Sequence, residues 1–308
     1  MTRHFLRDDD LSPAEQAEVL SLAATLKRSP YDSQSLAGPR TVATIYDKPT
    51  LRTQASFAAG IAELGGNPMM VDGSLAGIGK RESVADVARV LGRQASVIVW
   101  RTYAQTALDE MAEYSGVPVV NALTDEFHPC QLLADLLTIR EHLGELAGLT
   151  AAFVGDGACN MGNSWLLAGA TAGLHVRIAA PEGHQPEEQY VARAREIAAG
   201  TGGSAEVMTD PVEAVRGADV VVTDTWVSMG REEEAAARLA AFGSYTVTAD
   251  LLAHASPGAI VLHCLPAYRG KEIDSDVLDG PQSVVWDEAE NRRHAQKAIL
   301  TWLLEVAP

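Results

Sequence analysis

Strand and helix patterns alternate along the second half of the chain, and this alternation constrains the fold more than any other feature. Short apolar runs typical of buried strands lie at 149–154, 175–180, 205–208, 220–223 and 260–263. Helix patterns separate the first four of these runs, at 163–172, 186–199 and 211–218. Such alternation is typical of a parallel sheet with helices on both faces. We therefore predict an α/β fold.

The first half carries a similar but less regular series. Strand runs lie at 40–46, 95–100 and 117–121, and helix patterns at 83–92 and 132–143. An earlier helix opens at Ser12, followed by Pro13 and by Glu15 as a capping box. The glycines of 143–148 predict a hinge. We expect two domains, 1–143 and 148–288, each with a central parallel sheet flanked by helices. A helix at 289–305, within the C-terminal segment 289–308, is expected to pack back on the first domain.

Composition excludes several classes of protein. The 308 residues are 47% hydrophobic and 21% charged, as in ordinary globular proteins. The formal net charge of -17 argues against nucleic acid or an anionic membrane as partner, because both need a basic surface. No apolar run approaches the roughly 20 residues of a membrane span. Because there is also no secretory signal, and the three cysteines show no zinc-type spacing, we predict a cytoplasmic protein.

Four short polar clusters carry the chemistry. They are Thr50-Leu51-Arg52-Thr53, the segment 127–131, the segment 224–230 and the segment 263–266. The first lies between a predicted strand and a predicted helix, where free N–H groups and the helix dipole favour an anion. By itself such a cluster is more often a helix cap with a solvated arginine than an anion site. Arg101 ends a strand, where ligands of open α/β sheets bind, and His128 and Gln131 lie one helical turn apart, so those two can share one face of a helix start.

In this order the four clusters resemble the signature of the aspartate/ornithine transcarbamylase family, and within it of the ornithine carbamoyltransferases. The resemblance runs from Arg3 to the last helix. It implies transfer of the carbamoyl group of carbamoyl phosphate to the δ-amine of L-ornithine, giving L-citrulline and phosphate in arginine biosynthesis. It implies no metal and no organic cofactor. The family usually forms trimers or multiples of trimers, so a homo-oligomer is expected.

The resemblance also implies roles for individual residues. Those matching the carbamoyl phosphate site are Thr50, Leu51, Arg52, Thr53, Arg101, His128, Gln131, Cys264, Leu265 and Arg292. Those matching the ornithine site are Asn160, Asp224, Ser228 and Met229. The residues expected at the reacting atoms are Arg101, His128 and Cys264.

Three positions depart from the family pattern. Leu51 stands where the family has threonine, and Gln54 stands where it has a second arginine, so a positive charge near the phosphate is missing. Tyr268 stands where histidine is common. In addition, Lys80 and Arg81 lie in a segment that, in the family, approaches a neighbouring subunit; a solvated helix start explains them equally well.

Alternatives remain open from the residues alone. The acceptor could be another amine, such as putrescine, lysine or acylornithine, or the chain could be a non-catalytic homologue. A dinucleotide-dependent oxidoreductase is disfavoured, because the glycines at 155, 157 and 162 do not have the required spacing.

Overall fold

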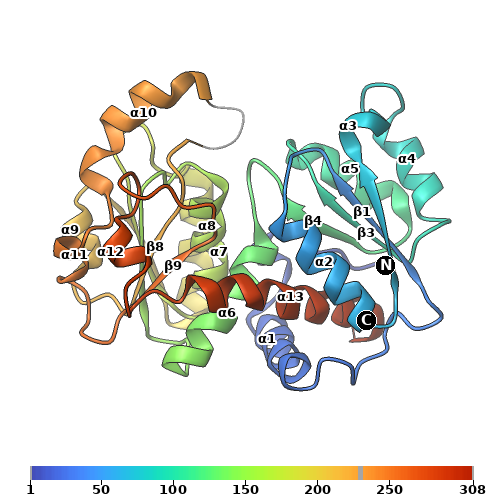
Figure 1. The fold of residues 1–308 in the computed structure, drawn as a ribbon, viewed down its shortest axis with the longest axis horizontal. Helices are drawn as coiled ribbons and strands as arrows, with labels where there is room; N and C mark the ends of the chain where they lie inside the picture. The colour runs from blue at the N-terminus through green and yellow to red at the C-terminus, as the bar shows by residue number, and fades with distance from the viewer. Residues whose placement is uncertain (1, 228–231, 307–308) are drawn as a thin grey trace. The chain divides into compact units, whose positions relative to one another are not determined.

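The computed structural model describes residues 2–227 and 232–306. The chain divides into two compact units, Met1–Leu137 with Glu290–Pro308, and Thr138–Ala289. Both boundaries fall inside helices, in α6 (Pro129–Leu143) and in α13 (Val285–Thr301) (Figure 1). Among the described residues, no helix is long and apolar enough to cross a membrane.

The first unit is built on a parallel sheet of four strands in the order β2-β1-β3-β4. The strands are β1 Thr41–Tyr46, β2 Asn67–Asp72, β3 Val97–Arg101 and β4 Val119–Leu123. Its helices are α1 Pro13–Arg28, α2 Arg52–Glu63, α3 Gly73–Ala76, α4 Val84–Leu91 and α5 Gln105–Ser115, with parts of α6 and α13. Short turns of other helix types lie at Asp8–Asp10 and Trp302–Val306. The expected capping box at Ser12 is confirmed.

Helices pack on both faces of this sheet, as the apolar strand runs predicted. On one face Ile45 and Trp100 pack with Ala88 of α4 and Met111 of α5. On α2, Gly60 lies against α13, because a Cβ placed there would be 3.1 Å from Lys297 Cγ. All residues of β3 and all but the first of β1 are buried, as expected for strands covered on both faces, which explains their mostly apolar sequence.

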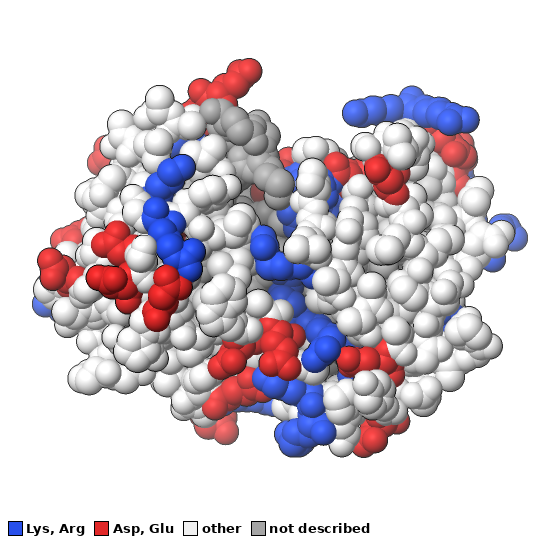
Figure 2. All heavy atoms as spheres, in the orientation of Figure 1, with Lys and Arg blue, Asp and Glu red and all other residues white. Residues whose placement is uncertain are grey.

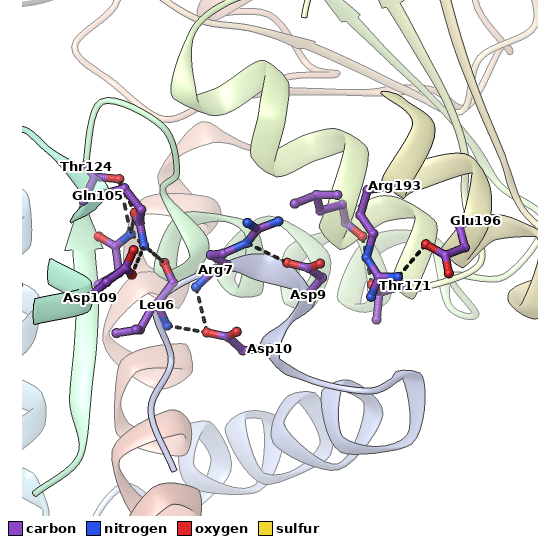
Figure 3. Close-up of polar contacts among 12 residues, drawn as sticks. Leu6, Arg7, Asp9, Asp10, Gln105, Asp109, Thr124, Thr171, Arg193 and Glu196 are labelled. Atoms are coloured by element: carbon purple, nitrogen blue, oxygen red, sulfur yellow. Dashed lines mark hydrogen bonds and ion pairs between the residues drawn. The ribbon is translucent and has the colours of Figure 1, made fainter. Parts of the chain in front are cut away.

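The N-terminal segment adds to the outer edge of β4. Phe5 forms a parallel bridge with Val120, so the edge strand is partly paired. The Asp10 carboxylate accepts hydrogen bonds from the N–H groups of Leu6 and Arg7, at 2.6 and 2.9 Å (Figure 3). These bonds close the turn that carries the chain from this edge into α1.

The second unit is built on a parallel sheet of five strands in the order β7-β6-β5-β8-β9. The strands are β5 Thr150–Val154, β6 His175–Ala179, β7 Ser204–Met208, β8 Val220–Thr223 and β9 Ile260–His263. The helices are α7 Asn160–Thr171, α8 Glu188–Thr201, α9 Pro211–Val215, α10 Ala235–Phe242, α11 Ala249–Leu252 and α12 Ser275–Leu278. Two short 3₁₀ turns are Glu232–Glu234 and Gly243–Tyr245. The predicted α/β class with parallel sheets is confirmed in both units.

Several elements differ from the sequence prediction. Strand β2 was missed because it is an edge strand with half of its residues exposed, and its apolar run is only Met69-Met70-Val71, next to Pro68. Helices α5 and α10 were also missed. Helix α7 begins at Asn160 rather than at 163, and α13 begins at Val285 rather than at 289, because the bounds of a helix are the least certain part of a prediction from sequence.

A buried ion pair holds the C-terminal helix to the first unit. Lys297 on α13 is fully buried, and its Nζ lies 2.7 Å from Glu63 Oε2 on α2. The same Nζ donates hydrogen bonds to the carbonyl oxygens of Leu26 and Pro30, at 3.3 and 2.7 Å. A buried ammonium group is tolerated only with this full set of partners.

We expect Lys297→Met to lower the free energy of unfolding by about 2 to 3 kcal/mol, because it leaves the Glu63 carboxylate without its main partner. Arg293 Nη1, 3.3 Å from Glu63 Oε1, limits the loss. Urea denaturation followed by circular dichroism measures it. The control is Arg89→Met, which removes an exposed pair with Asp86 and should cost less than about 0.5 kcal/mol. Equal denaturation midpoints for the two variants would contradict this account of the buried pair.

Candidate active site

The strand order places most candidate residues at the switch point of each sheet. In the first unit β1 and β3 are neighbours, and the chain leaves them toward opposite sides; in the second unit β5 and β8 have this relation. Ligands of open parallel sheets bind at the carboxyl ends of such strands. The 50–53 loop follows β1 and Arg101 ends β3, whereas Asn160 and Asp224 follow β5 and β8.

The 50–53 loop forms the start of α2. The Thr53 N–H lies 3.4 Å from Thr50 Oγ1, so the threonine side chain caps the first turn. Thr53 is buried, whereas the Leu51 side chain is 78% exposed. The Leu51 side chain therefore offers nothing polar here, and only its backbone N–H can serve an anion at this helix start.

Arg292 connects two other candidates of the first unit. Its Nη1 donates to Gln131 Oε1 at 2.6 Å, and its Nη2 donates to Thr53 Oγ1 at 3.2 Å. Gln131 in turn donates from Nε2 to Asp135 Oδ1 at 2.8 Å. Three residues far apart in the sequence are thus fixed in one buried hydrogen-bonded cluster. The Arg292 guanidinium and the Thr53 hydroxyl group are suited to bind an oxyanion.

Arg101 and His128 lie in the same unit and are both buried. Arg101 is the register partner of Tyr46 on β1, and His128 immediately precedes α6. Burial, followed by the charges of Arg292, Arg101, Lys48 and Arg52, holds the pKa of His128 well below its usual range. Near neutral pH the imidazole is therefore uncharged, so it can donate one hydrogen bond without adding a positive charge.

Lys48 is a further cation of this site that sequence reasoning missed. It is buried just before the 50–53 loop, where it forms an ion pair with Asp125. Its Nζ also lies 4.5 Å from the centroid of the Tyr103 ring. Burial lowers its pKa, and the hydrogen bond with Asp125 opposes this shift. The only signal in the sequence was its position two residues after the end of a predicted strand.

These cations explain how an acidic chain can hold an anion. The net charge is -17, yet Lys48, Arg52, Arg101 and Arg292 all contribute positive charge at His128. On the face drawn in Figure 2, Asp and Glu side chains lie in separate groups rather than in one patch. The positive potential is therefore a local property of the first unit.

In the second unit Asp224 and Cys264 lie side by side. They follow the paired ends of β8 and β9, where Thr223 is the register partner of His263. Cys264 Sγ donates to Asp224 Oδ1 at 3.2 Å. Burial raises the pKa of Asp224, although the charge of His263 and hydrogen bonds from Thr225 and Cys264 oppose the shift. This carboxylate can accept an ammonium group.

His263 supports the loop that carries Cys264, a role that sequence reasoning did not assign. Its Nδ1 accepts the Leu265 N–H at 2.9 Å, and its Nε2 lies 3.2 Å from Glu272 Oε1. The backbone N–H of His263 donates to Glu288 Oε2 at 2.8 Å. Leu265 has φ of 57°, an unfavourable value for a side chain of this size. These bonds offset that strain and fix where the Leu265 carbonyl lies.

Asn160 is the first residue of α7, which begins directly after the loop that follows β5. A Cβ at Gly162 would lie 2.2 Å from the Gly157 carbonyl oxygen, so the helix can approach this loop only with glycine there. Asn160 is thereby placed at the carboxyl end of the sheet. Ser228 and Met229, the remaining ornithine candidates, lie outside the described residues.

A metal site is the other chemistry that this arrangement could support. Asp224, His263 and Cys264 offer ligand atoms within 4.8 Å of one another. However, both His263 ring nitrogens already face hydrogen-bond partners within the protein. The imidazole is therefore used to hold its loop, and the three groups do not form an open set of ligands.

Comparison with known proteins covers the whole chain. The family model described as aspartate/ornithine carbamoyltransferase, carbamoyl-P binding domain, matches residues 3–141. The model described as the Asp/Orn binding domain of the same family matches residues 147–303.

Individual relatives agree with these models. An ornithine carbamoyltransferase of Clavibacter michiganensis is 67% identical over 99% of both chains. The solved structure of the ornithine carbamoyltransferase from Pyrococcus furiosus is 41% identical, with a TM-score of 0.95 over 100% of this chain and 98% of that one. An anabolic ornithine carbamoyltransferase from Campylobacter jejuni is 35% identical, with a TM-score of 0.92 over 98% of each chain. The chain therefore belongs to the aspartate/ornithine carbamoyltransferase family, and within it to the ornithine carbamoyltransferases.

Proposed function

We propose that this protein transfers the carbamoyl group of carbamoyl phosphate to the δ-amine of L-ornithine, giving L-citrulline and phosphate. The observation that carries the proposal is the buried cluster of Thr53, Gln131 and Arg292, with neutral His128 among four cations. Such a cluster fits a phosphorylated carbonyl compound, because it combines positive charge for phosphate with uncharged donors for a carbonyl oxygen.

In this proposal the segment 1–143 with 289–308 binds carbamoyl phosphate. The phosphate occupies the start of α2, where it contacts Thr50, Arg52, Thr53 and the Leu51 N–H. Arg101 spans the phosphate and the carbonyl oxygen. Gln131 and Arg292 hold the carbamoyl end, with the backbone carbonyls of Cys264 and Leu265 accepting its NH₂ group.

The segment 148–288 binds ornithine. Asp224 accepts the α-ammonium group, Asn160 donates to the α-carboxylate, and Ser228 and Met229 add contacts to the amino-acid end. Cys264 lies beside the δ-amine. It is not a nucleophile, because the amine attacks the carbonyl carbon directly.

The reaction needs no protein base in this scheme. The neutral δ-amine attacks the carbonyl carbon, and negative charge develops on the carbonyl oxygen. Arg101, His128 and Thr53 stabilise this oxyanion, each with a donor already in place before reaction. The bond to phosphate then breaks, and the departing phosphate takes the amine proton.

We further propose that the chain acts in arginine biosynthesis in the cytoplasm, as a trimer or a multiple of trimers. One structural relative, that of Campylobacter jejuni, is an anabolic ornithine carbamoyltransferase, which supports the pathway. Cys130, Cys159 and Cys264, all within the described residues, form no disulfide bond, which suits a reducing compartment. Met70 and Leu75 of the first unit are 61% and 80% exposed, so they offer apolar surface for another copy. The molar mass of the protein in solution tests this assembly, because it should be three times that of one chain or a multiple of that value.

The direct test is citrulline formation by the purified protein, with ornithine saturating and carbamoyl phosphate varied. We expect turnover. The KM for carbamoyl phosphate shows whether Leu51 and Gln54, which depart from the family pattern, weaken the binding of this substrate. Turnover only at very high carbamoyl phosphate would locate a defect in the 50–53 loop. If the protein instead carbamoylates putrescine, lysine or acylornithine, that amine and not ornithine is the acceptor. No product with any amine would refute the proposal.

Two substitutions separate the roles of the two units. Arg101→Ala should lower kcat by about a hundredfold to a thousandfold, because a donor to the developing oxyanion is lost. Asp224→Ala should chiefly raise the KM for ornithine, by about tenfold or more, because a charged hydrogen-bond partner is lost. Steady-state kinetics measure both, and Arg89→Ala at the exposed pair with Asp86 is the control. Wild-type kinetics in both variants would exclude these residues from the site.

The raised pKa of Asp224 predicts how amino-acid binding depends on pH. Only the ionised carboxylate can accept the α-ammonium group, so affinity should fall as the pH drops through that raised pKa. The fall should begin above pH of about 4, where an exposed aspartate protonates. Calorimetry with L-norvaline, which lacks the reacting δ-amine, measures this in the presence of carbamoyl phosphate. Asp224→Asn should bind weakly at every pH; an unchanged pH profile in this variant would assign the titration to another group.

A further inference from the structure

Arg238 is a buried charge whose position the proposed chemistry does not explain. It lies on α10, yet its side chain is only 4% exposed. Its Nη2 forms an ion pair with the Asp156 carboxylate, which is equally buried, and its Nε donates to the carbonyl oxygen of Trp226. A third contact reaches Glu234, 3.3 Å from Nη1.

The two partners of this guanidinium belong to the two loops at the switch point of the second sheet. Asp156 lies in the loop after β5, four residues before Asn160. Trp226 lies in the loop after β8, two residues after Asp224. One side chain therefore joins the segments that carry both described candidates for amino-acid binding.

Each loop is also secured on its own side. Asp156 Oδ1 accepts the Ala158 N–H at 3.2 Å, which closes the turn before α7. The Trp226 ring stacks on Phe242 of α10, with centroids 5.8 Å apart and planes at 20°. The guanidinium carbon of Arg238 lies 5.5 Å from the centroid of the same Phe242 ring. Arg238 and Phe242 of α10 thus pack against both loops.

The chemistry requires arginine rather than lysine. A planar guanidinium can donate to a carboxylate and to a carbonyl oxygen at the same time from different nitrogens. An ammonium group on a flexible stem is a point charge, and it cannot hold the two acceptors in one fixed geometry. A ligand that contacts both the loop after β5 and the loop after β8 binds best when the distance between these loops is fixed.

We propose that Arg238, through Asp156 and the Trp226 carbonyl, is a positioning residue that sets the affinity of this site for the amino-acid substrate. The inference rests on the proposed function, because the acceptor is ornithine. Arg238 touches the two loops and not the substrate. Its loss should therefore raise the KM for ornithine. The KM for carbamoyl phosphate should stay unchanged, because the proposed contacts of that substrate lie in the first unit and at Cys264 and Leu265, whose loop is held by His263.

The test compares four variants by citrulline formation, with each substrate varied in turn. Arg238→Met removes the positive charge, and Asp156→Asn combined with Arg238→Met also removes the carboxylate that would remain buried without its partner. Arg238→Lys keeps the charge but not the two-acceptor geometry. Arg195→Met is the matched control, because Arg195 forms an exposed pair with Glu188 in the same unit, at 3.6 Å.

We expect the first three variants to raise the KM for ornithine by about tenfold or more, with the smallest effect in Arg238→Lys. The KM for carbamoyl phosphate should stay within about twofold of wild type, as should both constants in the control. Thermal unfolding shows which variants are folded. If Arg238→Met alone fails to fold, the double variant and Arg238→Lys give the answer.

Three results would overturn the proposal. They are an unchanged KM for ornithine in folded Arg238→Lys and in the double variant, equal rises in both KM values, or a loss of activity that only follows the loss of folded protein. The last two would show a structural role alone. Wild-type protein that makes no citrulline would instead refute the proposed function, so the two failures are distinguishable.

Discussion

In a parallel sheet every strand ends at the same edge, and this constraint decides where the chemistry of this protein lies. In both units the strand order changes direction once, between β1 and β3 and between β5 and β8. The loops that leave such neighbouring strands diverge and open a crevice. The residues proposed to bind phosphate and the amino acid follow these four strands. The order of the strands therefore places these residues at one edge of each sheet, independently of side-chain contacts.

Positive charge is concentrated at the carboxyl end of the first sheet. The chain is strongly acidic, but Arg101, Arg292 and Lys48 are buried near His128. A cation in a dry environment acts on an anion far more strongly than one in water. The same cations depress the pKa of His128 and so keep it neutral. Local placement therefore outweighs the overall charge of the chain.

The two loops of the second unit are fixed by buried polar contacts rather than by apolar packing alone. His263 holds Leu265 in an unfavourable backbone conformation, and Arg238 holds Asp156 and Trp226. Each contact costs desolvation and is supported by several partners. Buried polar groups of this kind specify one geometry, which a binding site needs more than it needs stability.

Much of the fold could be predicted from the sequence because it rests on local periodicity. The apolar runs of β5, β8 and β9 and the capping box at Ser12 are readable without any structure. Edge strand β2 was not predicted, since its apolar run of Met69-Met70-Val71 next to Pro68 is too short to be distinctive. The candidate clusters at 50–53 and 127–131 were recognisable because each motif is contiguous.

Contacts between distant residues could not be predicted in this way. Arg292 lies 239 residues from Thr53, and Arg238 lies 82 residues from Asp156. Lys48 looked like any charged loop residue, and His263 like part of a strand. The sequence by itself determined which elements form and which motifs they carry, because those depend on near neighbours. Only the tertiary structure decided which charges are buried together, because that depends on how the strands are ordered and what packs on them.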